Sequence, residues 1–332
     1  MTIPANATIT SIQAAAARAQ GTVRQTPLLS SPFLDEIAGR PVFIKAEVLQ
    51  HTGSFKFRGA WAALTALGPP HRAKGVVAFS SGNHAQGVAR AAQILNIPAT
   101  IIMPEDAPAL KIANTRAFGA EVVTYTRNSP ETRESLGARL QTERDLHLVR
   151  PYDDPLVISG QGTCGLEIAA QAAARSIDRA TVLTCCGGGG LTAGIALALA
   201  TVAPGLQVRP VEPEGFDDAA RSLAAGHIVR NDGPEHGFWD AILTPAPGDI
   251  TFPILHRFCG PGVVVTESET RAAMRLAASR LKLMVEPGGA VALAAALFHG
   301  ADLAPGPVIC TLSGGNVDLD LFAQILADPD DM

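Results

Sequence analysis

The sequence is poor in the residues that stabilise secreted proteins and bind nucleic acids. Its cysteines number five, an odd count, and none has the C-x₂-C spacing of a tetrahedral zinc site. Lysine and arginine total 26 against 31 acidic residues, and no basic stripe runs along the chain. We therefore expect neither a disulfide framework nor a structural zinc, and no nucleic-acid partner.

Long apolar runs without breakers are also missing. One long uncharged stretch, residues 184–203, contains five glycines. Four of them are consecutive and would break a membrane helix, so a strand, a loop and a helix are the better interpretation. The first twenty residues lack a basic stretch followed by an apolar core. The sequence thus predicts a cytoplasmic protein with no signal peptide and no membrane partner.

What remains is the composition of a globular α/β protein. In 332 residues, 47% are hydrophobic and 17% charged, which is enough to bury a large core. From residue 76 onward, β-branched runs alternate with alanine-rich stretches, a pattern typical of parallel βαβ units. Strands are expected at 76–79, 99–103, 121–126, 146–150, 181–184, 207–212, 263–266 and 307–311, and helices at 85–95, 109–118, 131–142, 191–202, 267–281 and 289–297.

Three loops follow expected strands, where open α/β sheets bind their ligands. One is CCGGGGLTAG, in which Gly187 to Gly190 precede a helix, so that bare backbone N–H groups can converge on a phosphate. Its spacing matches neither a P-loop nor G-x-G-x-x-G. The alternative is a tight turn that packs the helix on the sheet.

The other two loops carry small polar side chains. SSGNH, at 80–84, offers hydroxyl, amide and backbone donors that suit a carboxylate. It could equally be no more than a helix cap. Ser313, in TLSGGNVD, could bond a heterocyclic nitrogen or simply belong to a turn.

Lys56 lies between Phe55 and Phe57 in HTGSFKFRGA, residues 51–60. Apolar surroundings lower the pKa of a lysine and produce the neutral nucleophile. A buried lysine together with a phosphate loop indicates pyridoxal phosphate, which forms a Schiff base with lysine and is held through its phosphate. For the lysine alone, the alternative is a solvated side chain whose stem lies on apolar surface.

Eight motifs, in order, resemble the fold-type II pyridoxal-phosphate enzymes, in the branch of the threonine/serine dehydratases and serine racemase. They cover most of the chain and read TPLL (26–29), GSFKFRGA (53–60), SSGNHAQG (80–87), GQGT (160–163), GGGGLTAGI (187–195), VEPEGFDD (211–218), VEPGGA (285–290) and TLSGGNVDL (311–319). The resemblance implies a tryptophan synthase β-like fold of two open parallel-sheet domains. Residues 1–51 and 151–332 would form the larger, cofactor-binding domain, and 52–150 a smaller mobile one. A homodimer is also implied.

The resemblance also implies roles for single residues. Lys56 would form the Schiff base with pyridoxal 5'-phosphate and act as the catalytic base. The cofactor would be bound by Phe55 against its ring, Asn83 at its phenolic oxygen, Ser313 at its pyridine nitrogen, and Gly187, Gly188, Gly189, Gly190 and Leu191 around its phosphate. The substrate carboxylate would be received by Ser80, Ser81, Asn83 and His84. Ser81 also lies where racemases place a second base.

A divalent cation site is implied by VEPEGFDD. Glu212, the Phe216 carbonyl and Asp218 would supply oxygen ligands to Mg²⁺, Mn²⁺ or Ca²⁺. The alternative is an acidic turn that follows a strand.

The implied activity is a lyase reaction, conversion of a β-hydroxy-α-amino acid such as L-threonine or L-serine to a 2-keto acid and ammonia. A serine racemase or a 3-hydroxyaspartate dehydratase/racemase is the alternative. His236, Phe238 and Trp239 could shape a pocket for 3-hydroxyaspartate, or simply pack beneath their loop. A β-replacement synthase is less favoured, because its loop usually reads TSGNTG where this chain has His84-Ala85-Gln86. A non-enzymatic phosphate-binding protein would leave Lys56 unexplained.

Overall fold

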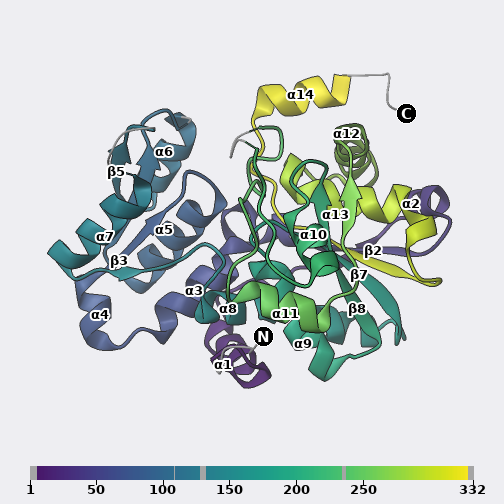
Figure 1. Cartoon of the computed structure of the whole chain (residues 1–332), viewed down its shortest axis with the longest axis horizontal. Helices are drawn as coiled ribbons and strands as arrows, with labels where there is room; N and C mark the ends of the chain where they lie inside the picture. The colour runs from purple at the N-terminus through teal and green to yellow at the C-terminus, as the bar shows by residue number, and fades with distance from the viewer. Residues whose placement is uncertain (1–5, 108, 128–131, 234–236, 328–332) are drawn as a thin grey trace.

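The chain folds around two separate β-sheets (Figure 1). The computed structural model describes residues 6–107, 109–127, 132–233 and 237–327. Within these residues, a six-stranded sheet has the order β1-β2-β10-β7-β8-β9 and a four-stranded sheet the order β5-β4-β3-β6. All neighbouring strands are parallel except β1 and β2. The predicted α/β fold with two open parallel sheets is confirmed, and we call the part built on each sheet the larger and the smaller lobe.

The elements have the following bounds. The strands are β1 Leu28–Ser30, β2 Val42–Ala46, β3 Val76–Phe79, β4 Ala99–Pro104, β5 Glu121–Tyr125, β6 His147–Leu148, β7 Ala180–Cys185, β8 Leu206–Pro213, β9 Val263–Val265 and β10 Val308–Leu312. The α-helices are α1 Ile9–Ala19, α2 Pro32–Ala38, α3 Lys56–Ala66, α4 Pro69–Lys74, α5 Asn83–Leu95, α6 Ala109–Ala117, α7 Arg133–Arg144, α8 Pro155–Ala173, α9 Gly190–Val202, α10 Asp218–Ala225, α11 Thr251–Phe258, α12 Glu267–Leu276, α13 Pro287–Phe298 and α14 Leu319–Ala327. A π-helical turn, Ala277–Leu281, extends α12.

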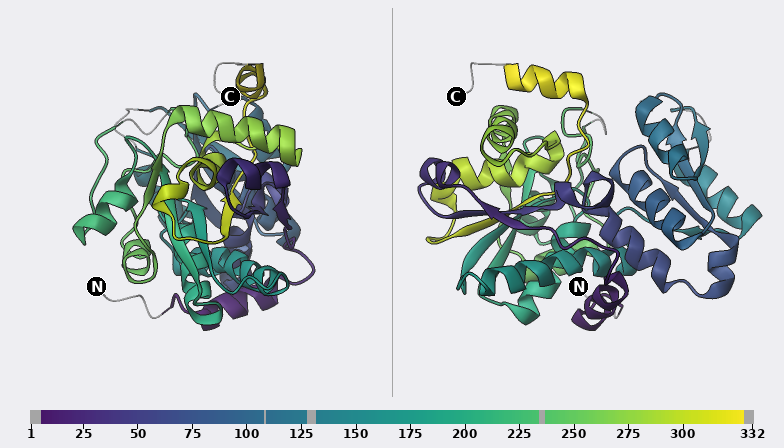
Figure 2. Two further views of the ribbon diagram at one scale, coloured as in Figure 1. Left: turned by 90° about the vertical axis from the view of Figure 1, so that its right-hand side faces the viewer. Right: turned by 180° about the vertical axis from the view of Figure 1, so that it is seen from behind.

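The central strands of the larger sheet are buried on both faces. Every residue of β10 is buried, as expected of a parallel strand that is covered by helices on either side. Leu183 and Cys310 pack into a core with α13, whereas their neighbours Val182 and Ile309 pack into another core with α8 and α9. Successive side chains of these strands therefore point to opposite faces of the sheet, and each face is covered by its own layer of helices. Helices α1 and α14 lie at opposite ends of the molecule (Figure 2).

Helices α8 and α9 approach so closely that glycine is required at their contact. A Cβ atom on Gly194 would lie 2.5 Å from the Gly162 nitrogen, and one on Gly165 would lie 2.8 Å from Cβ of Ala198. Asp154 caps α8, because its carboxylate accepts hydrogen bonds from the second and third helical N–H groups. This close pair supports β7 and the glycine loop that follows it.

The predicted elements from residue 76 onward are present, with two differences. The strand expected at 146–150 is reduced to β6, and the helix expected at 267–281 changes from α to π winding at Ala277. Residue 131, the expected start of one helix, lies outside the described residues. The structure also contains elements that the alternation from residue 76 did not predict. They are β1, β2, α1 to α4, α8, α10, α11 and α14.

The four-stranded sheet draws all its strands from residues 76–148. The domain limits at 52 and 151, and the mobility of the smaller domain, stay predictions. No helix in the described part of the chain is long and apolar enough to cross a membrane.

Candidate active site

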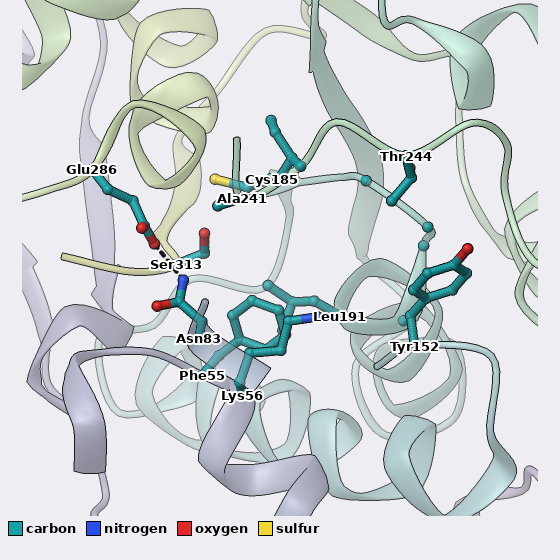
Figure 3. Close-up of a pocket in the computed structure, with 15 residues that line it drawn as sticks. Phe55, Lys56, Asn83, Tyr152, Cys185, Leu191, Ala241, Thr244, Glu286 and Ser313 are labelled. Atoms are coloured by element: carbon teal, nitrogen blue, oxygen red, sulfur yellow. Dashed lines mark hydrogen bonds between the residues drawn. The ribbon is translucent and has the colours of Figure 1, made fainter. Parts of the chain in front are cut away.

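A cavity of about 510 Å³, including its opening to solvent, lies where the loops after β3, β7 and β10 meet (Figure 3). It is thus at the carboxyl ends of parallel strands, as the sequence predicted. Its walls come from both lobes and consist of Phe55, Lys56, Asn83, Tyr152, Cys185, Gly187, Gly188, Gly189, Gly190, Leu191, Ala241, Ile242, Thr244, Glu286 and Ser313.

The turn before Lys56 is fastened to the loop after β10. Thr52 and Gly53 both adopt the left-handed region, with φ of 58° and 73°. The Asn316 amide donates to the Thr52 carbonyl at 2.7 Å, and a Cβ atom on Gly53 would lie 2.9 Å from its oxygen. The Phe55 N–H in turn donates to the Ser313 carbonyl at 3.1 Å. The start of α3 is therefore held against the loop that carries Ser313.

Lys56 is the first residue of α3, and its amine is buried in the cavity wall. Nζ donates to the Pro151 carbonyl at 2.9 Å and lies 5.2 Å from the centre of the Phe55 ring. Burial lowers the pKa of Lys56 to about 8, although the Glu286 carboxyl acts in the opposite direction. The amine is thus prepared to act as a nucleophile or a base near neutral pH, as predicted from its neighbours.

The glycine loop, which leads to Leu191, forms another part of the cavity wall (Figure 3). Gly189 precedes α9 with a φ of 89°, a conformation that favours glycine. A Cβ atom on Gly188 would lie 2.3 Å from the Tyr152 ring, so no larger residue fits there. The first N–H groups of α9 lack helical acceptors and carry the positive end of the helix dipole. This wall can hold a phosphate through its backbone alone.

Ser313 and Cys185 stand side by side at the ends of β10 and β7. The Ser313 side chain is buried and lines the cavity. The thiol of Cys185 donates to the Gly289 carbonyl at 3.3 Å, and burial raises its pKa, so it stays protonated. Ser313 presents a neutral hydroxyl to the cavity, which can donate a hydrogen bond to an unprotonated pyridine nitrogen.

Glu286 is a cavity residue to which we assigned no role from the sequence. Its Oε1 accepts a hydrogen bond of 2.6 Å from Asn83, whose own oxygen accepts one from Asn316 at 2.6 Å. Burial raises the pKa of Glu286 to about 7, although the Asn83 bond acts in the opposite direction. Its motif, VEPGGA, was part of the resemblance, but a single acid before a proline gave no signal of its own.

Only one of the predicted carboxylate-binding residues in the SSGNH loop lines the cavity. That residue is Asn83, whereas Ser80, Ser81 and His84 are not among the residues of the cavity wall. Ser80 accepts a hydrogen bond from the Gly82 N–H at 3.1 Å, and Ser81 is half-buried. Burial and then the charge of Lys56 lower the pKa of His84 to about 3, so its neutral ring donates through Nε2 to the Val149 carbonyl at 2.9 Å. Their carboxylate-binding roles stay predictions.

The implied cation site contains two buried carboxylates. Glu212 is the penultimate residue of β8 and accepts hydrogen bonds from the N–H groups of Ala219 and Ala220, while Asp218 begins α10. Burial and their mutual repulsion raise the pKa of Glu212, and burial raises that of Asp218 to about 7. Asp218 Oδ2 is buried without a hydrogen-bond partner. Two such acids with an unpartnered oxygen fit a divalent cation.

In the described chain no three His, Cys, Asp or Glu side chains cluster as a metal site, and the implied third ligand, from Phe216, is a backbone carbonyl.

The segment suspected of shaping the substrate pocket packs elsewhere. Trp239 is buried and donates from Nε1 to Thr270 of α12 at 3.3 Å, and Phe238 meets its ring edge-on. His236 lies outside the described residues. The cavity is instead reached by Ala241, Ile242 and Thr244, which the sequence did not indicate.

The cavity therefore fits pyridoxal phosphate. A buried amine, a row of N–H groups at a helix N-terminus, a buried hydroxyl and the Asn83 amide face one space of the size of a small-molecule site. Lys56, Phe55, Asn83, Ser313 and the glycine loop converge as the resemblance implied, which is the requirement for one cofactor to contact them all.

Comparisons with known proteins agree with this geometry. Residues 19–314 match the family described as pyridoxal-phosphate dependent enzyme. The chain is 40% identical over 309 residues, 93% of both chains, to L-threo-3-hydroxyaspartate ammonia-lyase of Saccharomyces cerevisiae. The T.th. threonine deaminase superposes with a TM-score of 0.88 at 46% identity, covering 94% of this chain and 99% of that one. Maize serine racemase does so with 0.90 at 37%, covering 96% of each.

Proposed function

Because the chain belongs to the pyridoxal-phosphate dependent enzymes, we propose that it is an ammonia-lyase. Its substrate would be a β-hydroxy-α-amino acid, which loses the α-proton and the β-hydroxyl and yields, after hydrolysis, a 2-keto acid and ammonia. The observation that carries the proposal is the buried amine of Lys56, with a pKa of about 8, in one cavity with the glycine loop and Ser313.

Bound pyridoxal phosphate supplies an aldehyde that joins the substrate amine and withdraws electrons from the α-carbon. The N–H groups of residues 187–191 would hold its phosphate, and the neutral hydroxyl of Ser313 would bond its pyridine nitrogen without protonating it. In that state the cofactor would supply a moderate electron sink, which favours elimination. A general base that removes the α-proton typically contributes ~10²–10⁴-fold to the rate.

Lys56 performs the proton transfer at the α-carbon. Its amine accepts the α-proton in the neutral form, and because burial lowers the pKa of Lys56 to about 8, a larger fraction is neutral near pH 7 than for an ordinary lysine. The Pro151 carbonyl, 2.9 Å away, orients Nζ. The substrate carboxylate is directed to the first turn of α5, near Asn83, where helix N–H groups favour an anion.

The test is product analysis with purified holoenzyme. Incubation with L-serine, L-threonine and L-threo-3-hydroxyaspartate is expected to release 2-keto acid and ammonia in equal amounts from at least one of them. Lys56→Ala is the matched control and should release neither. A holoenzyme that leaves all three substrates intact would contradict the proposal.

Racemisation is the second candidate, because Ser81 lies in the loop before α5 and maize serine racemase is a structural relative. Chiral analysis of the same L-serine incubation separates the two, since D-serine formed faster than pyruvate would make racemisation the main activity. We also propose a cytoplasmic homodimer, on the resemblance and the cysteine content.

A further inference from the structure

An ion pair joins the two lobes beside the cavity. Nζ of Lys111, on α6 of the smaller lobe, lies 3.2 Å from Oδ2 of Asp240 in the larger lobe. Ala241 and Ile242, which follow Asp240 directly, line the cavity. The pair therefore stands at the edge of the site, where one lobe meets the other.

The pair is also close to Glu286. A Cβ atom on Gly288 would lie 3.2 Å from Cβ of Ala241, so the segment carrying Asp240 packs on the first turn of α13, which Glu286 precedes. Consistently, the charge of Asp240 raises the pKa of Glu286 and that of Lys111 lowers it. The ammonium of Lys111 is thus within electrostatic reach of a carboxyl in the cavity wall.

The contact can be exchanged. The side chains of Lys111 and Asp240 are 25% and 55% exposed, and ion pairs exposed to this degree contribute little to folding. Another carboxylate could therefore replace Asp240 as the partner of Lys111, and Asp240 would turn to solvent.

In a substrate bound as proposed, the side chain is the part whose binding residues remain to be identified. With the amine at the cofactor and the α-carboxylate at α5, the side chain faces the remaining wall. Serine and threonine carry no charge there, whereas 3-hydroxyaspartate carries a second carboxylate that needs a cation. Lys56 is committed to the cofactor, His84 is neutral, and Arg133 packs 5.9 Å from the Phe79 ring.

We propose that Lys111 selects dicarboxylic β-hydroxy-α-amino acids by exchanging Asp240 for the distal carboxylate of the substrate. This rests on the proposed function and names the substrate class of the same site. No covalent bond changes in the exchange. Lys111 is a specificity residue. Asp240 pairs with it at the edge of the cavity when no substrate carboxylate is bound there.

The first experiment compares kcat/KM for L-threo-3-hydroxyaspartate and L-serine. Lys111→Met should lower the value for hydroxyaspartate roughly 10- to 100-fold, as expected for the loss of one charge-assisted hydrogen bond, and change that for serine less than about 3-fold. Asp240→Asn should raise the value for hydroxyaspartate by about 2- to 10-fold, because Lys111 loses its competitor. Lys74→Met, which breaks an ion pair with Asp145 elsewhere on the smaller lobe, is the matched control and should change neither.

The two variants also exclude a purely mechanical role. If the pair only held the lobes together, Lys111→Met and Asp240→Asn would lower kcat/KM for both substrates alike, and that result would overturn the proposal. The proposal would also be overturned if Lys111→Met left the ratio of the two kcat/KM values unchanged. The same holds if Arg133→Met abolished the preference for hydroxyaspartate and Lys111→Met did not.

The second experiment does not depend on elimination. The Kd values of the holoenzyme for L-aspartate and L-alanine can be read from the absorbance of the bound cofactor. The enzyme should bind L-aspartate more tightly, and Lys111→Met should bring the two values within about 3-fold. A preference that survives in Lys111→Met, or is absent from the starting enzyme, contradicts the inference. A holoenzyme that binds L-aspartate through Lys111 but eliminates no substrate would contradict only the proposed function.

Discussion

Asn83 and Glu286 meet across the cavity in a hydrogen bond of 2.6 Å between Nδ2 and Oε1. One residue begins a helix of the smaller lobe and the other precedes a helix of the larger lobe. The bond therefore links the two lobes within the cavity wall, through a residue that is predicted to bind the cofactor.

Glu286 should make the protein less stable as the pH rises. Its pKa is about 7 in the folded chain against 4.5 ordinarily, so the folded state retains a proton that the unfolded state has lost between these values. The free energy of unfolding should then fall from pH 4.5 to pH 7, by up to about 3 kcal/mol at 1.36 kcal/mol per pKa unit. Urea unfolding of Glu286→Gln should match the parent at pH 5 and exceed it at pH 8. Equal stability of the two at pH 8 would show that the carboxylate is not penalised.

Lys56 should load the cofactor in a pH-dependent way. The neutral amine attacks the aldehyde, so the loading rate of the cofactor-free protein should rise with pH and reach half its maximum near the pKa of Lys56, about 8, instead of near 10.5. The growth of the cofactor absorbance after mixing measures this rate. Lys74→Met should give the same midpoint, and Lys56→Ala should give no such band. A midpoint near 10 would mean that the amine is solvated.

Gly188 should be intolerant of any side chain. In Gly188→Ala the new Cβ atom would lie 2.3 Å from the Tyr152 ring, so the loop or the ring must move and the phosphate donors with it. We expect the Kd for pyridoxal phosphate, measured by fluorescence titration, to rise at least about 10-fold, which corresponds to 1.4 kcal/mol. Gly68→Ala, whose Cβ atom would lie no closer than 3.8 Å to its neighbours, is the control. An unchanged Kd in Gly188→Ala would exclude a tight phosphate cradle.

Much of the site was predictable because its chemistry lies in local motifs. The left-handed turn at Gly53, the run of four glycines that leads into α9 and the lysine at the start of α3 each require particular residues at adjacent positions, so they can be recognised in the sequence. The strand-and-helix alternation after residue 76 was equally local. Phe57, the second aromatic neighbour of Lys56, is buried and packs against His51 and Trp61.

What the sequence did not predict depends on distant contacts. Helix α8 contains Gly160, Gly162 and Gly165, which argue against a helix locally, and the close approach of α1, α3 and α9 explains them. Glu286, Ala241, Ile242 and Thr244 line the cavity because other elements carry them there, and nothing in their own neighbourhoods in the sequence signals it. The same holds for the pair of Lys111 and Asp240, which are 129 residues apart.

Asp218 should determine whether the protein responds to divalent cations. Its unpartnered oxygen beside Glu212 is the feature that a cation would satisfy. Addition of Mg²⁺ or Mn²⁺ should raise the Tm of the protein, and Asp218→Asn should abolish the increase. Asp217→Asn is the matched control, because this neighbouring carboxylate pairs with Arg221 and is partly exposed. A Tm increase that survives in Asp218→Asn would place the cation elsewhere.

Arg58, two residues after Lys56, should be the most costly ion-pair residue to remove. It is fully buried, with Nε 2.7 Å from Glu47 and Nη1 2.7 Å from Glu167, and Lys45 lies 2.6 Å from Glu167. Burial would raise the pKa of Glu47, but the charge of Arg58 lowers it. Arg58→Met leaves that carboxylate without its main partner in a dry interior, which typically costs about 3–5 kcal/mol.

Urea unfolding measures this cost. The control is Arg144→Met, whose pair with Glu121 is half-exposed and should contribute no more than about 1 kcal/mol. Because α3 is anchored through Arg58 and begins at Lys56, Arg58→Lys should recover part of the stability but lose the forked contact with both acids. Similar losses in Arg58→Met and Arg144→Met would mean that water replaces the guanidinium, and that the buried network does not fix the helix that begins at Lys56.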